Sequence, residues 1–306
     1  MPKPIKWGIL GAAAIADGAI IPAIAASGNS SVLAIASRDV ERARVMAGKH
    51  GIDKVHATYA DLCADTNVDA VYVALPNSLH SEWSIRALEA GKHVLCEKPL
   101  AVTVLEGERM AMAAKLANRL LMEAFMYRFS PRIERFRASV HGLPLHVHSA
   151  FAYPTTERGN IRLSEALGGG ALMDLGCYAV SVARLFLGEP VQVKAFANVI
   201  GVDRSVSAAL LFPARGLATI WASFEAPEHQ HLTVITSEGV FHFEGRPFGA
   251  WYDPQQPERL APYVEMVQAF SKSVLTQSPV PLSVEDSLNN LRVIEEIRRS
   301  AGFSPT

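Results

Sequence analysis

In the N-terminal part of the chain, short apolar runs alternate with segments of helical periodicity, and this alternation constrains the fold more than any other feature. The apolar runs predict strands at residues 5–10, 32–37, 54–57, 70–75, 93–96 and 120–124. Helices are predicted between them, at residues 15–27, 40–50, 59–64, 79–90 and 104–118. Strands separated by helices form βαβ units with a parallel sheet covered on both faces. Residues 1–122 are therefore predicted to form a doubly wound α/β domain of the Rossmann type.

The pattern changes after Phe129-Ser130-Pro131. A helix is expected at 131–140, a strand at 146–153, and a helix at 171–187 that a glycine-rich turn opens. Strand-like stretches with short connections follow, at 191–202, 205–212, 216–224, 231–236 and 239–243, before helices at 263–276 and 284–300. Short connections favour antiparallel neighbours. Residues 123–306 are therefore predicted to form a substrate-binding α+β domain with a large, mostly antiparallel open sheet, whose second face a dimer would bury.

Composition argues against several classes of function. Lys and Arg number 29 against 30 Asp and Glu, so no basic excess favours nucleic-acid binding. We find no apolar run of the about 18 residues that a membrane span needs, since Asp17 and Pro22 interrupt the longest candidate. Three scattered cysteines favour neither a disulfide framework nor a Cys-rich metal site, and they fit a reduced, cytoplasmic compartment.

Two histidine pairs alternate along predicted strand segments, His146 with His148 and His229 with His231. Alternation places each pair on one face of a strand, which by itself would suggest a metal ion. No carboxylate or cysteine lies beside them at ligand spacing, so we expect no metal site.

A nucleotide-binding turn is predicted where the first strand ends. The segment Gly11-Ala12-Ala13-Ala14-Ile15-Ala16 fits the G-x-G-x-x-G/A template, with Ala13 where glycine usually lets a pyrophosphate approach the backbone. The helix N-terminus that follows offers N–H groups and a partial positive charge to phosphates. We assign Gly11, Ala13, Ala14 and Ile15 to cofactor binding, with an alanine-rich turn into an ordinary helix as the alternative.

The end of the second strand indicates which dinucleotide binds. NAD-binding domains carry an acidic residue there that holds the ribose 2′-hydroxyl, but this strand ends in Ser37 and Arg38. A hydroxyl and a guanidinium suit a 2′-phosphate. We therefore expect NADP(H), with NAD(H) possible; the alternative is that Ser37, Arg38 and Asp39 only begin the next helix.

Two more turns lie at the carboxyl ends of strands, where ligands bind in open parallel sheets. The residues that we assign there to the cofactor are Leu75, Pro76, Asn77 and His80 after the fourth strand, and Glu97 and Lys98 after the fifth. A lysine at this edge has an apolar stem and a charged head at the crevice. The alternative for Lys98 is an ordinary surface lysine before a turn.

A third group of candidate residues follows Gly168-Gly169-Gly170. Asp174 and Tyr178 are four residues apart on a predicted helix and so share a face. Gly176 lies inside that helix at a cost of about 1 kcal/mol relative to alanine, which suggests a close approach by another part of the molecule. The alternative is that Tyr178 belongs to the core and Asp174 interacts with the helix dipole.

Taken together, the segments Gly8–Gly11, Glu97–Pro99, Glu123–Phe129 and Gly168–Tyr178 resemble the glucose–fructose oxidoreductase, inositol dehydrogenase and MocA family over nearly the whole chain. Many members carry histidine at the position of Tyr178. Tyrosine there, together with Gly159-Asn160-Ile161-Arg162, resembles the branch that contains dimeric dihydrodiol dehydrogenase and NADP-dependent xylose dehydrogenase.

The resemblance implies hydride transfer between nicotinamide and a carbinol or carbonyl carbon of a sugar or vicinal diol. Tyr178 would be the general acid/base, assisted by Lys98, because a nearby ammonium group favours a phenolate over a phenol of pKa near ~10. Asp174 would orient the substrate hydroxyl or Tyr178, and Arg162 would contact cofactor or substrate. The pocket walls would be Met126, Phe129, Phe151 and Tyr153, each of which is otherwise plain core. The fold and the resemblance together imply a homodimer.

Two other classes of function stay open. A non-catalytic NAD(P)-sensing regulator can share this fold, although Lys98, Asp174 and Tyr178 argue against it because a sensor needs no proton relay. A reductase for a carbonyl or imine is the second alternative, although the polar Asp174 and Arg162 favour a hydroxylated ligand.

Overall fold

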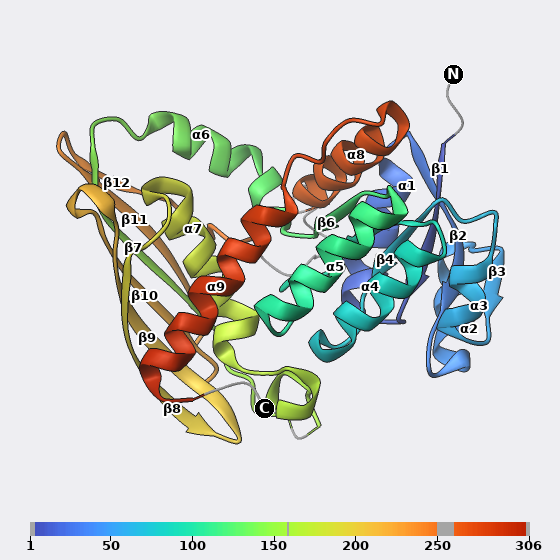
Figure 1. Cartoon of the computed structure of the whole chain (residues 1–306), viewed down its shortest axis with the longest axis horizontal. Coiled ribbons are helices and arrows are strands. Elements are labelled where there is room, and N and C mark those ends of the chain that lie inside the picture. The colour runs from blue at the N-terminus through green and yellow to red at the C-terminus, as the bar shows by residue number, and fades with distance from the viewer. Residues whose placement is uncertain (1–3, 158, 250–259, 304–306) are drawn as a thin grey trace. The chain divides into compact units, whose positions relative to one another are not determined.

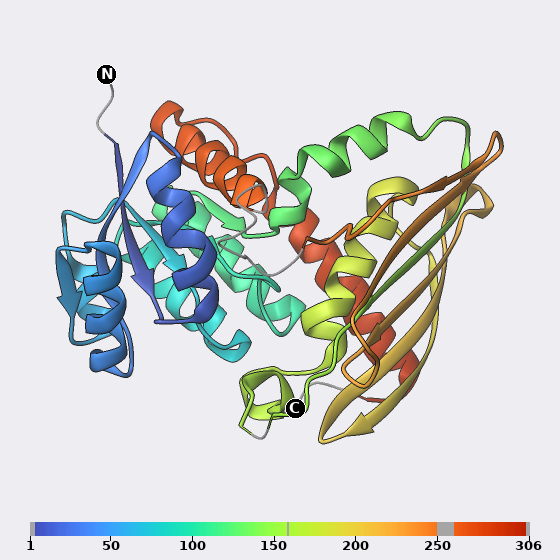
Figure 2. The same ribbon diagram turned by 180° about the vertical axis from the view of Figure 1, so that it is seen from behind.

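The computed structural model describes residues 4–157, 159–249 and 260–303, which form two compact units (Figures 1 and 2). The first unit contains residues 4–100, 105–130 and 260–285, and the second contains 101–104, 131–157, 159–249 and 286–303. The division therefore differs from the expected boundary between residues 122 and 123. Residues 123–130 group with the first unit, and helix α8 (Ala261–Thr276) returns to it, because Phe270 packs against Trp7 with ring centroids 5.4 Å apart.

Sheet A of the first unit is wholly parallel, with strand order β3-β2-β1-β4-β5-β6. Its strands are β1 (Ile5–Leu10), β2 (Ser30–Ala36), β3 (Lys54–His56), β4 (Ala70–Val73), β5 (His93–Cys96) and β6 (Leu121–Glu123). The order reverses between β1 and β4, so the chain has the topological switch point at which such sheets bind ligands. The predicted doubly wound fold is confirmed.

Helices cover both faces of sheet A. The helices that accompany it are α1 (Ile21–Ala26), α2 (Val40–His50), α3 (Tyr59–Ala64), α4 (His80–Glu89), α5 (Val104–Ala117) and α8. Trp7 of β1 packs against α8, whereas its neighbour Gly8 faces Leu62 of α3, with no room for a side chain. Successive residues of a strand point to opposite faces, so α8 and α3 lie on opposite sides of the sheet.

The helix predicted at 15–27 consists of two pieces. A π-helical turn, η1 (Ala16–Ile20), comes first, and α1 starts at Ile21. The backbone stays helical across the junction, since Ile20 and Ile21 both have right-handed helical angles, and Pro22 just beyond it has no N–H to donate to the preceding turn. A π-helical turn at this position is of interest because such turns occur frequently at functional sites.

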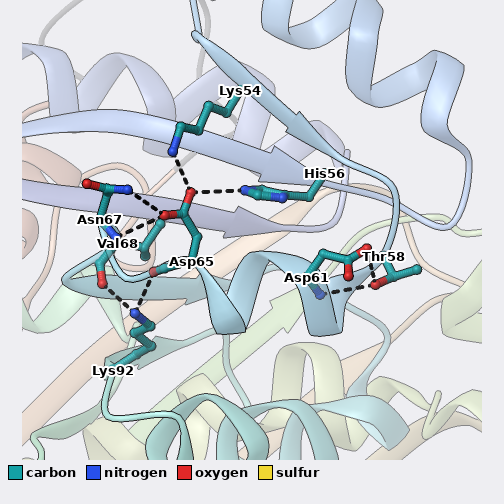
Figure 3. Close-up of polar contacts among 8 residues, drawn as sticks. All are labelled: Lys54, His56, Thr58, Asp61, Asp65, Asn67, Val68 and Lys92. Carbon is teal, nitrogen blue, oxygen red and sulfur yellow. Dashed lines mark hydrogen bonds and ion pairs between the residues drawn. The ribbon is translucent and has the colours of Figure 1, made fainter.

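A polar network fastens the end of sheet A where its strands begin (Figure 3). The Asp65 carboxylate accepts hydrogen bonds from Lys54 Nζ at 2.8 Å and Asn67 N at 2.9 Å, and it lies 3.2 Å from His56 Nε2. These contacts hold the pKa of Asp65 well below its usual range. The buried Lys92 donates to the carbonyl oxygens of Asp65 and Val68. The network thus ties the edge strand β3 to the segments before β4 and β5.

Sheet B of the second unit is open, with strand order β12-β11-β7-β10-β9-β8. Its strands are β7 (Pro144–Ala152), β8 (Gln192–Ile200), β9 (Val202–Leu211), β10 (Leu217–Ser223), β11 (His229–Thr236) and β12 (Val240–His242). All neighbours are antiparallel except β10 and β7, so the predicted mostly antiparallel sheet is confirmed. The prediction extended the strand to Val202, but Gly201, with a φ of +75°, makes the turn between β8 and β9.

Helices α7 (Cys177–Leu187) and α9 (Val284–Ala301) lie on one face of sheet B (Figures 1 and 2). Tyr178 of α7 packs against Phe151 of β7, and Ser300 of α9 accepts a hydrogen bond from the backbone N–H of Ala195 of β8. Asn290 of α9 donates to the Cys177 carbonyl oxygen at 3.1 Å and joins the two helices. Helix α6 (Pro131–Ser139) precedes the first strand of the sheet.

One stretch, Glu165–Leu187, is long and apolar enough to cross a membrane by length and composition alone. It is a different segment from the apolar run at residues 11–26, which Asp17 and Pro22 interrupt. Within the protein, 83% of its most apolar window is buried, so its apolar side chains belong to the core of the second unit.

Candidate active site

The turn after β1 has the geometry of a dinucleotide-binding turn. Gly11 adopts a φ of +104°, and a Cβ there would collide with the carbonyl oxygen of Ala74 in the neighbouring strand connection. Its N–H donates to Ala36 O at 2.8 Å, which holds the turn against β2. Ala13 is half-buried and Ala14 is exposed at the start of the helix. The chain thus presents backbone N–H groups at this point, which suits a pyrophosphate.

The end of β2 places a hydroxyl and two arginines at the same edge. Ser37 is buried and Arg38 is exposed, with its backbone N–H bonded to Tyr59 OH at 3.2 Å. Asp39 caps α2 by accepting from Arg42 N, so the segment also begins a helix, as the alternative reading holds. The Arg42 side chain reaches back and donates to Ala12 O at 2.9 Å. The sequence analysis missed Arg42, although its place four residues after Arg38 was a usable signal.

The turns after β4 and β5 are joined by His80. Leu75 is buried and Pro76 and Asn77 are half-buried in the first of these turns. His80 is only 1% exposed; its Nδ1 lies 2.8 Å from Pro99 O and its Nε2 lies 2.9 Å from Leu75 O. Burial lowers the pKa of His80, so the neutral imidazole is favoured. A neutral imidazole has a single N–H, so the ring donates to one of these carbonyl oxygens and only packs against the other. A direct contact of His80 with a cofactor stays a prediction.

Glu97 and Lys98 follow β5, and both are half-buried. The buried Tyr72 hydroxyl donates to Glu97 Oε1, and the other carboxylate oxygen accepts from Lys98 N at 3.1 Å. Burial, followed by the Glu97 charge, raises the pKa of Tyr72, which stays a neutral donor. The pair fixes the carboxylate at the edge of the sheet. Tyr72 is a second residue that the sequence analysis did not single out, because it reads as part of an apolar strand.

Met126 and Phe129 lie in η3 (Met126–Phe129), which belongs to the first unit. Met126 is buried and Phe129 is half-buried. Both were expected as pocket walls within the second domain. Their role in a pocket stays a prediction.

In the second unit, Asp174 is the centre of a polar cluster. Arg162 Nε donates to Asp174 Oδ2 at 2.8 Å, and Tyr153 OH donates to the same oxygen at 3.1 Å. The charge of Asp174 is the main cause that raises the pKa of Arg162, with smaller contributions from Tyr153 and Tyr178. The structure therefore adds Arg162 to Asp174 and Tyr178, the pair that the sequence predicts on one helix face.

Aromatic rings surround Tyr178 on the side of sheet B. The centroids of Phe151 and Phe248 each lie 5.5 Å from that of Tyr178, and they lie 5.4 Å from each other in a stacked arrangement. Tyr178 is 8% exposed and Phe248 is buried. Phe151 was expected in this wall, whereas Phe248 was missed because it lies in a loop 70 residues farther along the chain.

The glycines of this region are required by close packing. The Cβ of a residue at 169 would collide with the Arg162 carbonyl oxygen, and one at 170, where φ is +118°, would collide with the Asp203 carboxylate. At Gly176 a Cβ would lie 2.8 Å from Leu172 Cδ1 and 3.4 Å from Ala222 Cβ of β10. The tight contact at Gly176 is therefore with Leu172 of the same helical turn, whereas Ala222 of the sheet lies at ordinary van der Waals distance. Asp174 itself lies in a π-helical turn, η6 (Leu172–Gly176).

Within the described ranges, no three His, Cys, Asp or Glu side chains gather as a metal site. Cys177 is buried and contacts the Asp174 carbonyl oxygen, as expected of a packing residue.

Comparison with known proteins places these features among oxidoreductases. Residues 5–125 match a family model described as an oxidoreductase family with an NAD-binding Rossmann fold, and residues 134–242 match the GFO/IDH/MocA C-terminal domain. The D-xylose 1-dehydrogenase (NADP(+)) 2 of Haloferax volcanii is 37% identical over 97% of each chain. The trans-1,2-dihydrobenzene-1,2-diol dehydrogenase of Xenopus tropicalis is 32% identical over 77% of this chain and 74% of its own.

A solved structure agrees with these matches. The aldose-aldose oxidoreductase of Caulobacter crescentus, crystallised with glycerol, superposes with a TM-score of 0.82 at 28% identity, and the alignment covers 98% of each chain.

Proposed function

Because the chain belongs to the GFO/IDH/MocA oxidoreductase family, we propose that it transfers a hydride between NADP(H) and a carbinol or carbonyl carbon of a sugar or vicinal diol. The resemblance to the family and the prediction of an oxidoreductase are confirmed by the matches. The cluster of Asp174, Arg162 and Tyr178 supports the proposal further. In it, a carboxylate, a guanidinium and a phenol lie close together in the second unit.

Tyr178 is the proposed general acid/base. When bound, the nicotinamide supplies the carbon that accepts or donates the hydride. Tyr178 takes the hydroxyl proton at its phenolic oxygen during oxidation and returns it during reduction, a role that contributes about 10²–10⁴-fold in rate. The Arg162 guanidinium interacts electrostatically with Tyr178 and favours its phenolate form. The Lys98 ammonium is proposed to act in the same direction.

Asp174 is proposed to accept a hydrogen bond from a substrate hydroxyl. Its Oδ2 is already engaged by Arg162 and Tyr153, and these two contacts fix the orientation of the carboxylate. The aromatic faces of Phe151 and Phe248 beside Tyr178 suit the apolar face of a ring-shaped substrate. This combination favours a polyhydroxylated ring, in line with the sugar and the cyclic diol in the names of the two relatives.

NADP(H) is the proposed cofactor, with NAD(H) as the weaker ligand. No acidic residue follows β2 at the position that would hold a ribose 2′-hydroxyl; Ser37, Arg38 and Arg42 stand at this edge instead. Two guanidinium groups and a hydroxyl match the charge and geometry of a 2′-phosphate. The remaining cofactor contacts are assigned to the turns after β1, β4 and β5, and to Arg162.

We also propose that residues 1–122 form the cofactor-binding part and residues 123–306 the substrate-binding and dimerisation part, with residues 123–130 and α8 packed in the first unit. The proposed compartment is the cytoplasm. The proposed macromolecular partner is a second copy of this chain, bound through the face of sheet B that α7 and α9 do not cover.

A turnover assay tests the proposal. Purified protein is mixed with NADP⁺, or with NAD⁺ in parallel, and with a panel of aldoses, inositols and trans-diols, while near-UV absorbance follows reduction of the cofactor. We expect turnover with at least one sugar or diol and a preference for NADP⁺. Tight NADPH binding without turnover across the panel would favour the regulator, and reduction of ring carbonyls alone would favour the reductase.

A further inference from the structure

The face of sheet B opposite α7 and α9, here called the outer face, carries five histidines. They are His146 and His148 on β7, His229 and His231 on β11, and His242 on β12. The strand register pairs Thr233 with both His148 and His242, and it pairs Thr219 with His148, so these side chains share one face. The rings of His148 and His231 lie 5.0 Å apart, and those of His229 and His231 stack 6.1 Å apart.

Two threonine hydroxyls connect these rings. Thr219 Oγ1 lies 3.2 Å from His146 Nε2 and 2.8 Å from His148 Nδ1. Thr233 Oγ1 lies 2.8 Å from both His231 Nε2 and His242 Nδ1. A hydroxyl has one proton and two lone pairs, so it accepts from one neutral imidazole and donates to the other. All four contacts to the two hydroxyls can therefore be hydrogen bonds while the histidines are uncharged.

The outer face holds little other charge. Burial, followed for His148 and His231 by neighbouring histidines, lowers the pKa of His146, His148 and His231 below its ordinary value. Lys194 of β8 lies in the same cross-strand row as His148, and β9 and β10 contribute small, hydroxyl and apolar side chains to the rows between them. Near His229, Glu225 accepts from Asn198 and Glu228 pairs with Arg246. No carboxylate among the described residues contacts the histidine rings.

The outer face is also large and partly apolar. Phe196 of β8 is 83% exposed, and Leu217 and Val240 are exposed as well. Strands about 4.8 Å apart with a rise of about 3.4 Å per residue give this sheet a face on the order of 700 Å². A stable interface buries about 800 Å² per partner. The face therefore has nearly the size that a stable dimer needs.

The outer face can pair with the same face of a second copy of the chain. A two-fold axis places one patch against the same patch of the partner, so a surface of fixed charge would repel itself. The outer face, with neutral histidines, threonines and Trp221 at its centre, meets that condition. The same surface has no cationic excess for a nucleic acid at neutral pH.

We propose that protonation of the outer-face histidines separates the two copies of the chain that dock on this face. The proposal rests on the homodimer proposed above. Docking takes neutral imidazoles farther from water and brings those of two copies together, so the separated chains bind protons more readily than the pair. Stability of the pair is complete above the pKa that these histidines have in the separated chains, which burial already holds below the ordinary value of about 6.5, and it is lost as the pH falls through that pKa.

Each proton taken up on separation changes the dissociation constant about tenfold per pH unit. A symmetric dimer contains each histidine twice, so titration of one position raises the dissociation constant by up to about 100-fold per pH unit. Titration of both His148 and His231 raises it further. We therefore expect the dissociation constant to rise as the pH falls below the histidine pKa of the separated chains, by up to about 100-fold per pH unit for each position that titrates.

Sedimentation velocity over a concentration series at pH 7.5, 6.5 and 5.5 tests the proposal on the full chain of 33.1 kDa. The double variant His148→Gln with His231→Gln keeps neutral polar side chains and is expected to stay dimeric at pH 5.5. His50→Gln, at a half-buried histidine paired with Asp17 in the first unit, is the matched control and should dissociate as the wild type does. Phe196→Asp should give monomers at pH 7.5, and near-UV circular dichroism confirms folding in each case.

The outcomes separate the two claims. A wild-type monomer at pH 7.5 would overturn the dimer itself, without bearing on turnover. A wild-type dimer that persists unchanged at pH 5.5 would overturn the switch and leave the dimer. Dissociation of the double variant at pH 5.5, with the dissociation constant of the wild type, would show that other groups respond to acid.

Discussion

The Asp174–Arg162 pair offers the sharpest test of how the second unit builds its site. Arg162 Nε donates to Asp174 Oδ2 at 2.8 Å, and the side chains are 27% and 13% exposed. Asp174→Asn keeps the shape and an acceptor oxygen but removes the charge. A hydrogen bond to a charged group contributes about 1.5–3 kcal/mol. We expect the free energy of unfolding to fall by about 2 kcal/mol, because the half-buried guanidinium then lacks this counter-charge.

A double-mutant cycle isolates the interaction. Asp174→Asn, Arg162→Gln and their combination are compared by urea unfolding at pH 7.5, with Tyr153→Phe as the control that removes the 3.1 Å hydrogen bond and leaves the ion pair. Partners in direct contact give coupling energies of 0.5–3 kcal/mol, and we expect about 1–2 kcal/mol here. The control should cost about 1 kcal/mol.

Turnover provides the second readout. If the orientation of the Asp174 carboxylate matters, Arg162→Gln lowers kcat/KM even in a protein that is fully folded under assay conditions. Additive effects of the two substitutions on unfolding, or an unchanged kcat/KM in the folded Asp174→Asn variant, would refute this reasoning.

Three further predictions concern other residues. Tyr178→Phe should lower kcat by about 10²–10⁴-fold with NADPH affinity nearly unchanged; turnover at the wild-type rate would remove Tyr178 from proton transfer. Arg38→Ala and Arg42→Ala should each weaken NADPH binding by about 1.5–3 kcal/mol and NADH binding far less, as measured by fluorescence titration. Equal losses for the two cofactors would show that neither arginine recognises the 2′-phosphate. Burial raises the pKa of Asp203 to about 6. Since the folded pKa then exceeds the unfolded value of about 3.9, stability from this group is present below pH 4 and is lost as the pH rises through 6, by up to about 3 kcal/mol. Urea unfolding should therefore show the advantage of wild type over Asp203→Asn shrinking between pH 4.5 and pH 7.5, and a constant difference would contradict the shift.

The sequence predicted both sheets because their signals are local. Apolar runs, helical periodicity and glycine stops each lie within about 15 residues, which is the range over which such patterns carry information. The packing of α8 against the first unit could not be predicted from such local patterns. Its packing against β1 joins Phe270 to Trp7 across most of the chain, and no spacing rule connects them.

In the candidate site too, local patterns could be predicted from the sequence, whereas contacts between distant segments could not. Spacing alone put Asp174 and Tyr178 on one helix face, and the turn templates placed Gly11 and Lys98 at strand ends. Arg42 was missed although it follows Arg38 by one helical turn, and Phe248 was missed because it lies in a loop, where residue type gives no direction. A close approach at Gly176 was expected from the cost of a glycine inside a helix, but only the structure identifies the Leu172 side chain as the neighbour that leaves no room there.

Transfer of an isotopic label tests the central claim most directly. The substrate identified by the panel, deuterated at the carbinol carbon that is oxidised, is incubated with NADP⁺ and the protein, and the reduced cofactor is analysed by mass spectrometry and NMR. The account predicts deuterium on the nicotinamide ring of NADPH. With the Tyr178→Phe variant, it predicts that little labelled NADPH forms. Oxidised substrate without label in the cofactor would contradict direct hydride transfer.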